Sequence, residues 1–115
     1  LQTKARIRNA QIQQKQATIN ADAARNTLQQ NVSSAALNLQ AAEDRFEVLN
    51  KQKDAFTQSF NVATTRLENG VINAVEYLIA KNNLDRTSSN LIISQYDYIL
   101  RAMVLDYYSG VVNFK

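Results

Sequence analysis

The sequence predicts an all-α protein that folds as one long antiparallel helical hairpin, a coiled coil. The 115 residues include no proline and only two glycines, Gly70 and Gly110, so the chain has almost none of the residues that turns require. Apolar residues also keep a heptad spacing over long stretches on both sides of Gly70. An all-β fold, which needs many turns, is thereby excluded. We expect helix in more than about 85% of the residues.

The first helix is predicted from about residue 2 to residue 68. Its apolar seam steps alternately by four and three residues and has one polar member, Lys53. The seam positions are Leu28, Val32, Ala35, Leu39, Ala42, Phe46, Leu49, Lys53, Phe56, Phe60, Ala63 and Leu67. A second row of small residues repeats every seven positions, at Ala41, Val48, Ala55 and Val62. Such a helix spans on the order of 100 Å and is expected to have a neighbour on each of two flanks.

Upstream of about residue 25 the apolar pattern weakens and shifts by about two positions. It passes through Ala5, Ile12, Ile19 and Ala23. This stretch is also basic, with five positive side chains against Asp22: Lys4, Arg6, Arg8, Lys15 and Arg25. Such a cluster is typical of a solvated helix face, and a binding patch is the alternative.

The turn of the hairpin is predicted at residues 69–72, within Glu68-Asn69-Gly70-Val71-Ile72. Gly70 can adopt the left-handed conformation that closes a helix. Asn73 and Glu76 have the spacing of a capping box. We therefore expect the second helix to begin near residue 73 and to end near residue 109, at Ser109-Gly110.

The second helix carries its own heptad row, at Tyr77, Leu84, Leu91, Tyr98, Leu105 and Val112. Between residues 91 and 108 apolar side chains occur on all sides of the helix, and Asp97, Arg101 and Asp106 argue against a membrane span. Tyrosines in this stretch are expected to anchor boundaries between packed helices and water.

When the two predicted helices are paired in antiparallel orientation around Gly70, residues 1–30 have no partner helix within the chain. We expect another chain or a missing part of the polypeptide to cover them.

Composition excludes several kinds of function. Histidine and cysteine are absent, which removes thiol and imidazole catalysis and the usual zinc sites, so we expect no cofactor and no metal. The carboxylates of Glu43, Asp44 and Glu47 are best explained as a helix surface, and we do not expect an enzyme. A net charge of +3, with the aromatic residues mainly in the seams, does not indicate a nucleic-acid partner.

At the turn, the segment FNVATTRLENGVINAVEYLIAKNNL resembles the second repeat of the TolC-like outer-membrane efflux proteins. The positions that match the tip pattern of that family are Arg66, Gly70, Glu76, Leu78, Ala80 and Leu84. Leu67 departs from the usual aromatic residue. Asn73 departs from the usual Ser or Thr but caps a helix as well as Ser does. Downstream, Tyr98, Ala102, Leu105 and Gly110 are similar to the closing pattern of the family.

The resemblance covers essentially the whole chain and implies a trimeric channel in the cell outer membrane. Each protomer of such a channel supplies hairpins to an α-helical barrel in the periplasm. Export of small molecules or proteins then requires an inner-membrane pump and a periplasmic adaptor. By resemblance, Arg66, Gly70, Val71 and Asn73 form the adaptor-binding tip, and Glu76 belongs to the acidic pore entrance. The chain is then expected to be an excised periplasmic segment.

Simpler interpretations remain open for these residues. Gly70 meets a backbone requirement of the turn, and Glu76 belongs to the expected capping box. For the whole chain, the alternative is a structural coiled-coil module such as the hairpin of a periplasmic adaptor, although the Arg-x-x-Leu-x-x-x-Ser pattern of adaptor tips is not visible. Because the unpaired arm and the apolar end of the second helix both need covering, we expect the isolated chain to self-associate.

Overall fold

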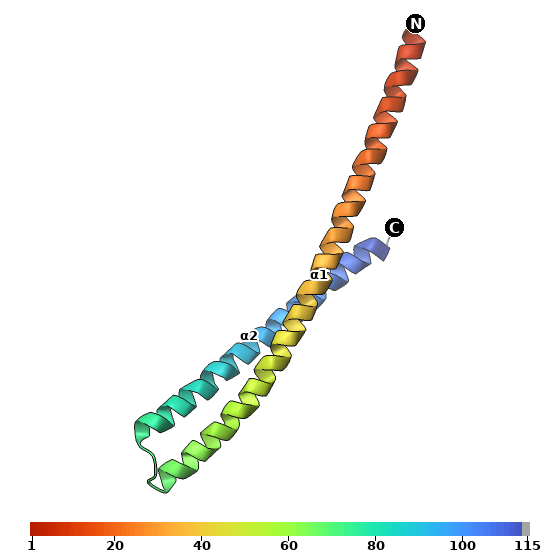
Figure 1. The fold of residues 1–115 in the computed structure, drawn as a ribbon. Helices are drawn as coiled ribbons and strands as arrows, with labels where there is room; N and C mark the ends of the chain where they lie inside the picture. Colours follow the sequence, from red (N-terminus) through yellow and green to blue (C-terminus); the bar gives the residue numbers. More distant parts are fainter. Residues whose placement is uncertain (114–115) are drawn as a thin grey trace.

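The structure, a computed structural model, describes residues 1–113, with side chains described as far as Gly110. It consists of two helices, α1 (Gln2–Glu68, 67 residues) and α2 (Ala74–Asn113, 40 residues), which fold back on each other as an antiparallel hairpin (Figure 1). Residues 1–113 contain no strand. The molecule measures 101 × 23 × 14 Å. The predicted all-α helical hairpin is therefore confirmed.

The interface between the helices follows the predicted seam of α1. Each of the twelve seam positions from Leu28 to Leu67 is buried or half-buried, including Lys53. The most deeply buried are three alanines, Ala35, Ala42 and Ala63, which are 4–9% exposed. Because their side chains are single methyl groups, the backbone of α2 can approach α1 closely at these levels. The second row of α1 at Ala41, Val48 and Ala55 is exposed, as is Val62.

The facing seam of α2 alternates large and small side chains. Tyr77 packs against Phe60 with ring centroids 5.4 Å apart, and Tyr98 packs against Phe46 at 6.5 Å. Between these aromatic contacts, Thr87 and Ser94 are only 4% exposed. Aromatic pairs of this kind contribute about 0.5–1.5 kcal/mol beyond the area they bury, so the two pairs favour one register of the hairpin.

The end of α2 differs from the sequence prediction. We expected Ser109-Gly110 to end the helix near residue 109, but α2 continues to Asn113. Among residues 1–113 only Gly70 has a positive φ, so Gly110 lies within the helix instead of closing it. A glycine inside a helix costs roughly 0.5–1 kcal/mol, which does not suffice to break it. Val112, the last residue of the predicted row, has its side chain outside the described set.

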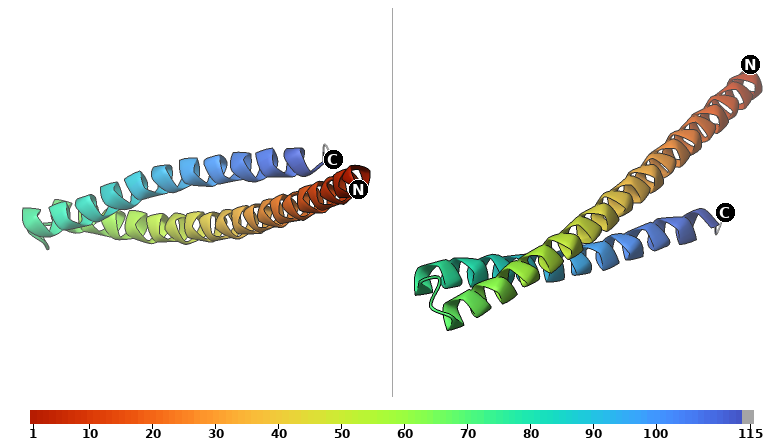
Figure 2. Two further views of the ribbon diagram at one scale, coloured as in Figure 1. Left: turned by 90° about the horizontal axis from the view of Figure 1, so that it is seen from above. Right: turned by 60° about the horizontal axis from the view of Figure 1, so that its bottom comes forward.

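The N-terminal part of α1 extends beyond the hairpin as a single helix. All side chains of residues 1–27, hereafter the overhang, are exposed, and the first half-buried residue is Leu28. Figure 2 shows α1 as a gently curved rod whose N-terminus lies beyond the end of α2. Five threonine hydroxyls of α1 donate to the carbonyl four residues earlier, an arrangement that often bends helices: Thr18, Thr27, Thr57, Thr64 and Thr65.

Candidate functional site

The C-terminal end of α1 is closed by two backbone hydrogen bonds across Gly70. The N–H of Val71 donates to the carbonyl of Arg66 at 2.8 Å, and the N–H of Gly70 donates to the carbonyl of Leu67 at 3.0 Å. This pair of bonds is a Schellman motif, which requires a left-handed residue, and Gly70 has a φ of 71°. A Cβ added to Gly70 would meet no atom within 4 Å, so only the backbone conformation demands glycine there.

The N-terminal end of α2 is capped by Asn73. Its Oδ1 accepts a hydrogen bond of 2.9 Å from the backbone N–H of Glu76, and its carbonyl accepts the first helical bond from Tyr77 at 3.3 Å. The capping role expected of Asn73 is confirmed. Among the described hydrogen bonds, none returns from the Glu76 carboxylate to the Asn73 N–H. Only the asparagine half of the expected capping box is therefore formed.

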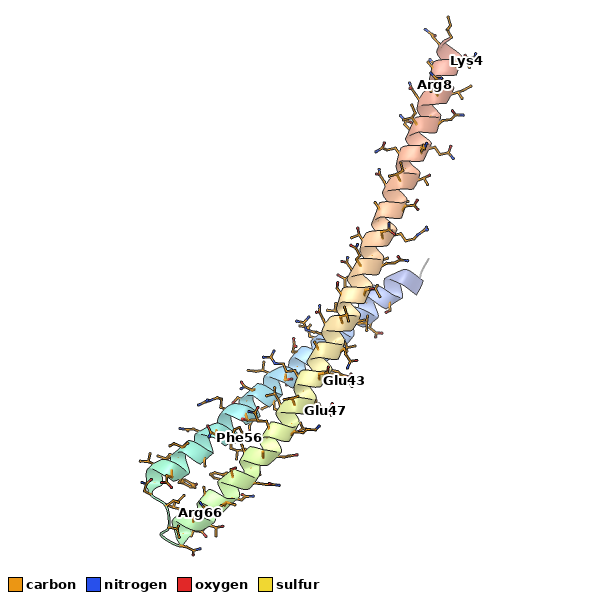
Figure 3. All side chains as sticks on the ribbon, viewed as in Figure 1. Lys4, Arg8, Glu43, Glu47, Phe56 and Arg66 are labelled. Atoms are coloured by element: carbon orange, nitrogen blue, oxygen red, sulfur yellow. The ribbon has the colours of Figure 1, made fainter. Side chains whose placement is uncertain are left out.

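A shallow groove of about 610 Å³ lies between the two helices just above the tip. Two of the sequence-predicted residues, Arg66 from α1 and Glu76 from α2, line it. The remaining lining residues are Ala55, Gln58, Ser59, Val62, Ala63 and Ile72. The groove is therefore lined by apolar and uncharged polar side chains, with one charged side chain of each sign. Figure 3 shows Arg66 at this end of the hairpin.

The other predicted tip residues lie apart from this groove. Gly70, Val71 and Asn73 belong to the link at residues 69–73, and none of them lines the groove. Val71 is 70% exposed, so its apolar side chain projects from the turn. The tip thus presents two neighbouring features, an exposed turn and a groove behind it.

The outer face of α2 toward its C-terminal end exposes many large apolar side chains. Large side chains that are 40–70% exposed occupy eight positions between residues 92 and 107: Ile92, Ile93, Tyr96, Ile99, Leu100, Met103, Val104 and Tyr107. We call this surface the α2 face. Exposed apolar surfaces of this kind are typical of sites at which proteins contact one another.

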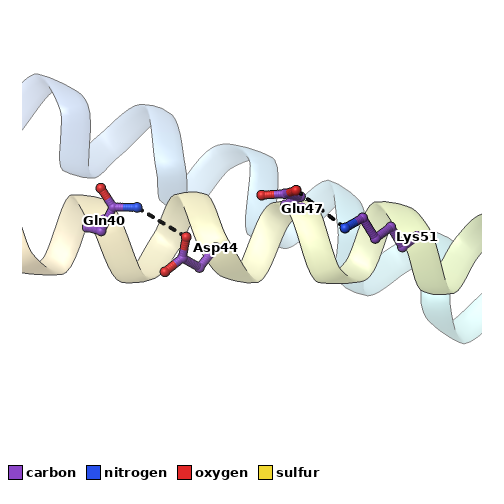
Figure 4. A network of polar contacts seen from close by, with 4 residues as sticks. All are labelled: Gln40, Asp44, Glu47 and Lys51. Carbon is purple, nitrogen blue, oxygen red and sulfur yellow. Dashed lines mark hydrogen bonds and ion pairs between the residues drawn. The ribbon is translucent and has the colours of Figure 1, made fainter.

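The carboxylates near the middle of α1 are bonded along their own helix. Asp44 accepts a hydrogen bond of 3.1 Å from Gln40, and Glu47 forms an ion pair of 3.5 Å with Lys51 (Figure 4). Both pairs span one helical turn on an exposed surface, where each contributes about 0.2–0.5 kcal/mol. No group of acidic residues that could hold a metal ion occurs in the part of the chain described. Likewise, no described helix is long and apolar enough to cross a membrane.

Two polar features of α2 were not found by the sequence analysis. Arg101 pairs with Asp97 at 3.3 Å, and both line a cleft of about 320 Å³ between the helices that also includes Asn31 and Tyr108. Ser94 has a buried Oγ that accepts and donates no hydrogen bond within the described residues. Tyr77, Leu84 and Leu91 are seven residues apart, and the next position of the α2 seam, three residues after Leu91, is Ser94. Extending this spacing without regard to side-chain polarity would have placed Ser94 in the seam.

Comparison with known proteins identifies one family. The family model described as outer membrane efflux protein matches residues 2–110, which comprise both helices and the tip between them. No curated protein and no solved structure matches the chain.

Proposed function

The chain belongs to the outer membrane efflux protein family, and we propose that its hairpin is a wall segment of the periplasmic helical barrel of a trimeric efflux channel. The family is one of transport channels. In this proposal the channel exports small molecules or proteins, lies in the cell outer membrane with this hairpin in the periplasm, and works with an inner-membrane pump and a periplasmic adaptor. The chain itself catalyses no reaction and binds no nucleic acid.

The observation that carries the proposal is the exposed surface that the seam between the two helices leaves uncovered. The α2 face presents large apolar side chains, and the second row of α1 presents small residues such as Ala41 and Ala55. A closed ring of helices requires each hairpin to contact a neighbour on both sides. A hairpin that stands alone as a spacer, such as that of an adaptor, needs only the seam between its own two helices to bury its apolar side chains.

For the tip, we propose that Arg66, Gly70, Val71 and Asn73 form the surface on which the adaptor docks. The exposed Val71 supplies an apolar contact, and Gly70, which lacks a side chain, permits a close approach of the partner backbone. The groove lined by Arg66 and Glu76 lies directly behind this surface and could receive side chains of the adaptor.

For the pore, we propose that the Glu76 carboxylates of the three protomers form an acidic ring at the periplasmic entrance. Two observations support this role. The carboxylate lies at the tip end of the molecule, and the cap of α2 uses the backbone N–H of Glu76 and not its side chain. A ring of three negative charges selects cations.

The experiment that tests the proposed function is export by the complete channel protein with altered tips. Gly70→Val and Val71→Asp are expected to lower drug resistance while the trimer level in the outer membrane stays normal. Leu37→Asp, an exposed apolar position far from the tip, is the matched control for adaptor docking. Unchanged export by both tip variants would reject the docking assignment.

A further inference from the structure

One side of the hairpin is hollowed along the line where the two helices meet. The groove behind the tip lies on this side, and three clefts of about 320, 340 and 160 Å³ lie on it farther from the tip. The three clefts adjoin, because Asp97 and Arg101 line all of them. No residue of the overhang lines the groove or the clefts. We call this side of the hairpin the cleft face.

Two rows of residues, polar except at Val104, border the cleft face. Each member directly precedes a seam residue and the members are seven apart, so each row keeps to one side of its helix. The α1 row is Asn31, Asn38, Arg45, Gln52, Ser59 and Arg66, and the α2 row is Glu76, Asn83, Asn90, Asp97 and Val104. All of them except Gln52 and Asn83 line the groove or one of the clefts.

The opposite side of the hairpin differs in charge. Six acidic residues directly follow a seam residue instead of preceding one, which places them on this side: Glu43, Glu47, Asp54, Glu68, Asp85 and Asp106. All six are exposed, and none lines the groove or the clefts. The one basic residue in such a position is Lys81, which follows the half-buried Ala80. The opposite side is therefore strongly acidic.

The charges of the cleft face gather at two levels. Arg66 and Glu76 line the groove behind the tip, whereas Arg45, Asp97 and Arg101 line the clefts. Glu76 and Asp97 are separated by 21 residues of α2, or about 30 Å. At the upper level Asp97 pairs with Arg101 at 3.3 Å, and Arg45 forms no ion pair within the described residues. The upper level therefore has an excess of one positive charge.

Hydrogen-bond donors surround the upper level. The amides of Asn38 and Asn90 line the same clefts as Arg45, and so does Ser94. Ser94 is 4% exposed, and its Oγ has no hydrogen-bond partner among the described residues. Buried hydroxyls normally have such a partner, so this one is available to an added ligand or water. Guanidinium groups beside neutral donors are the groups that bind anionic oxygens in proteins. Asp97 opposes an anion, but Arg101 already neutralises it.

The position of the cleft face in the channel follows from the proposed function, on which this inference rests. In a closed ring of hairpins, neighbours cover the outer sides of α1 and α2. The cleft face and the acidic side remain, and one of them must face the pore. Glu76, the residue proposed for the pore entrance, is a member of the α2 row that borders the cleft face.

We propose that the cleft face lines the pore and that Arg45 and Arg101 form a second, positively charged level in it, about 30 Å from the acidic entrance. This level binds the anionic oxygens of passing solutes. The entrance and the second level then have opposite charge preferences, and the amide-rich rows between them give a polar wall.

The first experiment is Arg45→Gln in the complete channel protein, measured in planar bilayers under a KCl gradient. We expect the reversal potential to shift toward greater cation preference, opposite to the shift expected for Glu76→Gln, because a positive charge leaves the pore wall. Lys81→Gln is the matched control, since it removes a positive charge from the acidic side, and should cause no shift. A shift for Lys81→Gln with none for Arg45→Gln would overturn the inference.

Inorganic phosphate is the probe for anion binding at the second level. In the wild-type channel we expect added phosphate to shift the reversal potential toward greater cation preference, because a bound anion cancels the positive charge of that level. Arg45→Gln should lose most of this response and Lys81→Gln should keep it. Equal responses of the wild type and Arg45→Gln, or none in the wild type, would overturn the assignment of the site.

A pair of cysteine variants tests the orientation of the hairpin separately. Gln52 precedes a seam residue and Asn50 follows one, so the two lie at almost the same distance from the tip but on opposite sides, and both are exposed. In a complete channel free of other cysteines, a bulky thiol reagent should lower the conductance of Gln52→Cys and leave that of Asn50→Cys unchanged. The reverse result would overturn this inference and keep the hairpin in the wall. No effect in either variant would reject the proposed wall segment itself.

Discussion

The side-chain oxygen of Asn73 accepts a 2.9 Å hydrogen bond from the backbone N–H of Glu76, which caps α2 at the point where the chain leaves the tip. The bond uses the backbone of Glu76, so the carboxylate of that residue is not needed for the cap. Two neighbouring residues that the sequence assigns to one motif therefore have separable roles. Asn73 begins the helix, and the side chain of Glu76 is available for the proposed acidic ring.

The cap predicts that Asn73→Ala destabilises the start of α2. Loss of an N-cap side chain typically costs about 0.5–2 kcal/mol in the free energy of unfolding. Asn73→Ser, which keeps an acceptor oxygen, should restore most of that stability. Urea unfolding followed by circular dichroism measures both variants. An alanine variant as stable as the wild type would show that the bond contributes nothing.

The proposed acidic ring predicts that Glu76→Gln lowers cation selectivity of the complete channel in planar bilayers. The same substitution should lower the unfolding free energy by no more than about 0.3–1 kcal/mol, the favourable effect of a negative charge at a helix N-terminus. Glu68→Gln removes the other carboxylate near the turn and serves as the control, with selectivity expected to stay unchanged. If both variants conduct like the wild type, the side chain of Glu76 has no role in the pore.

Gly70 is required by its backbone conformation, because a side chain there would meet open space. Gly70→Val should therefore cost about 1–2 kcal/mol, the strain of one left-handed residue, and leave both helices formed. Gly70→Asn should cost less, because asparagine adopts this conformation more readily. Thermal unfolding of the two variants at equal concentration gives the comparison, and equal midpoints would contradict the role of the Schellman motif.

Substitutions at two adjacent alanines test how closely the two helices pack. Ala42 is 4% exposed in the seam, whereas Ala41 is exposed on the second row. Ala42→Leu should destabilise the hairpin by about 1–3 kcal/mol, because three extra carbon atoms must fit between the helices. Ala41→Leu should change the stability by less than about 0.5 kcal/mol. Similar urea midpoints for the two variants would contradict the observed orientation of the seam.

Most of the hairpin could be predicted because a coiled-coil seam is a local, repeated signal. Each seam position of α1 was identified from spacing, and even Lys53 is half-buried as its place in the row requires. The end of α2 could not be predicted, because a glycine stops a helix only when the chain turns there. Gly70 takes the left-handed conformation and Gly110 does not.

The candidate site was predictable to a smaller extent. Sequence spacing identified Asn73 as a cap, but it could not tell whether the Glu76 carboxylate completes the capping box, since that depends on a side-chain rotamer. Arg66 and Glu76 line one groove because the two helices pack against each other. The sequence of neither helix alone predicts that groove. Ser94 is buried, but a serine carries no apolar signal that would mark it as part of the seam.

The position of the hairpin in the channel wall is tested most directly by an electron cryomicroscopy structure of the complete channel protein. We predict a trimer in which this hairpin lies in a closed periplasmic ring of helices, with Ile92, Tyr96 and Met103 buried against a neighbouring helix and the turn at Gly70 at the open periplasmic end. A structure in which these three side chains face solvent, or in which the hairpin stands outside any ring, would show that this hairpin is not a wall segment of the channel.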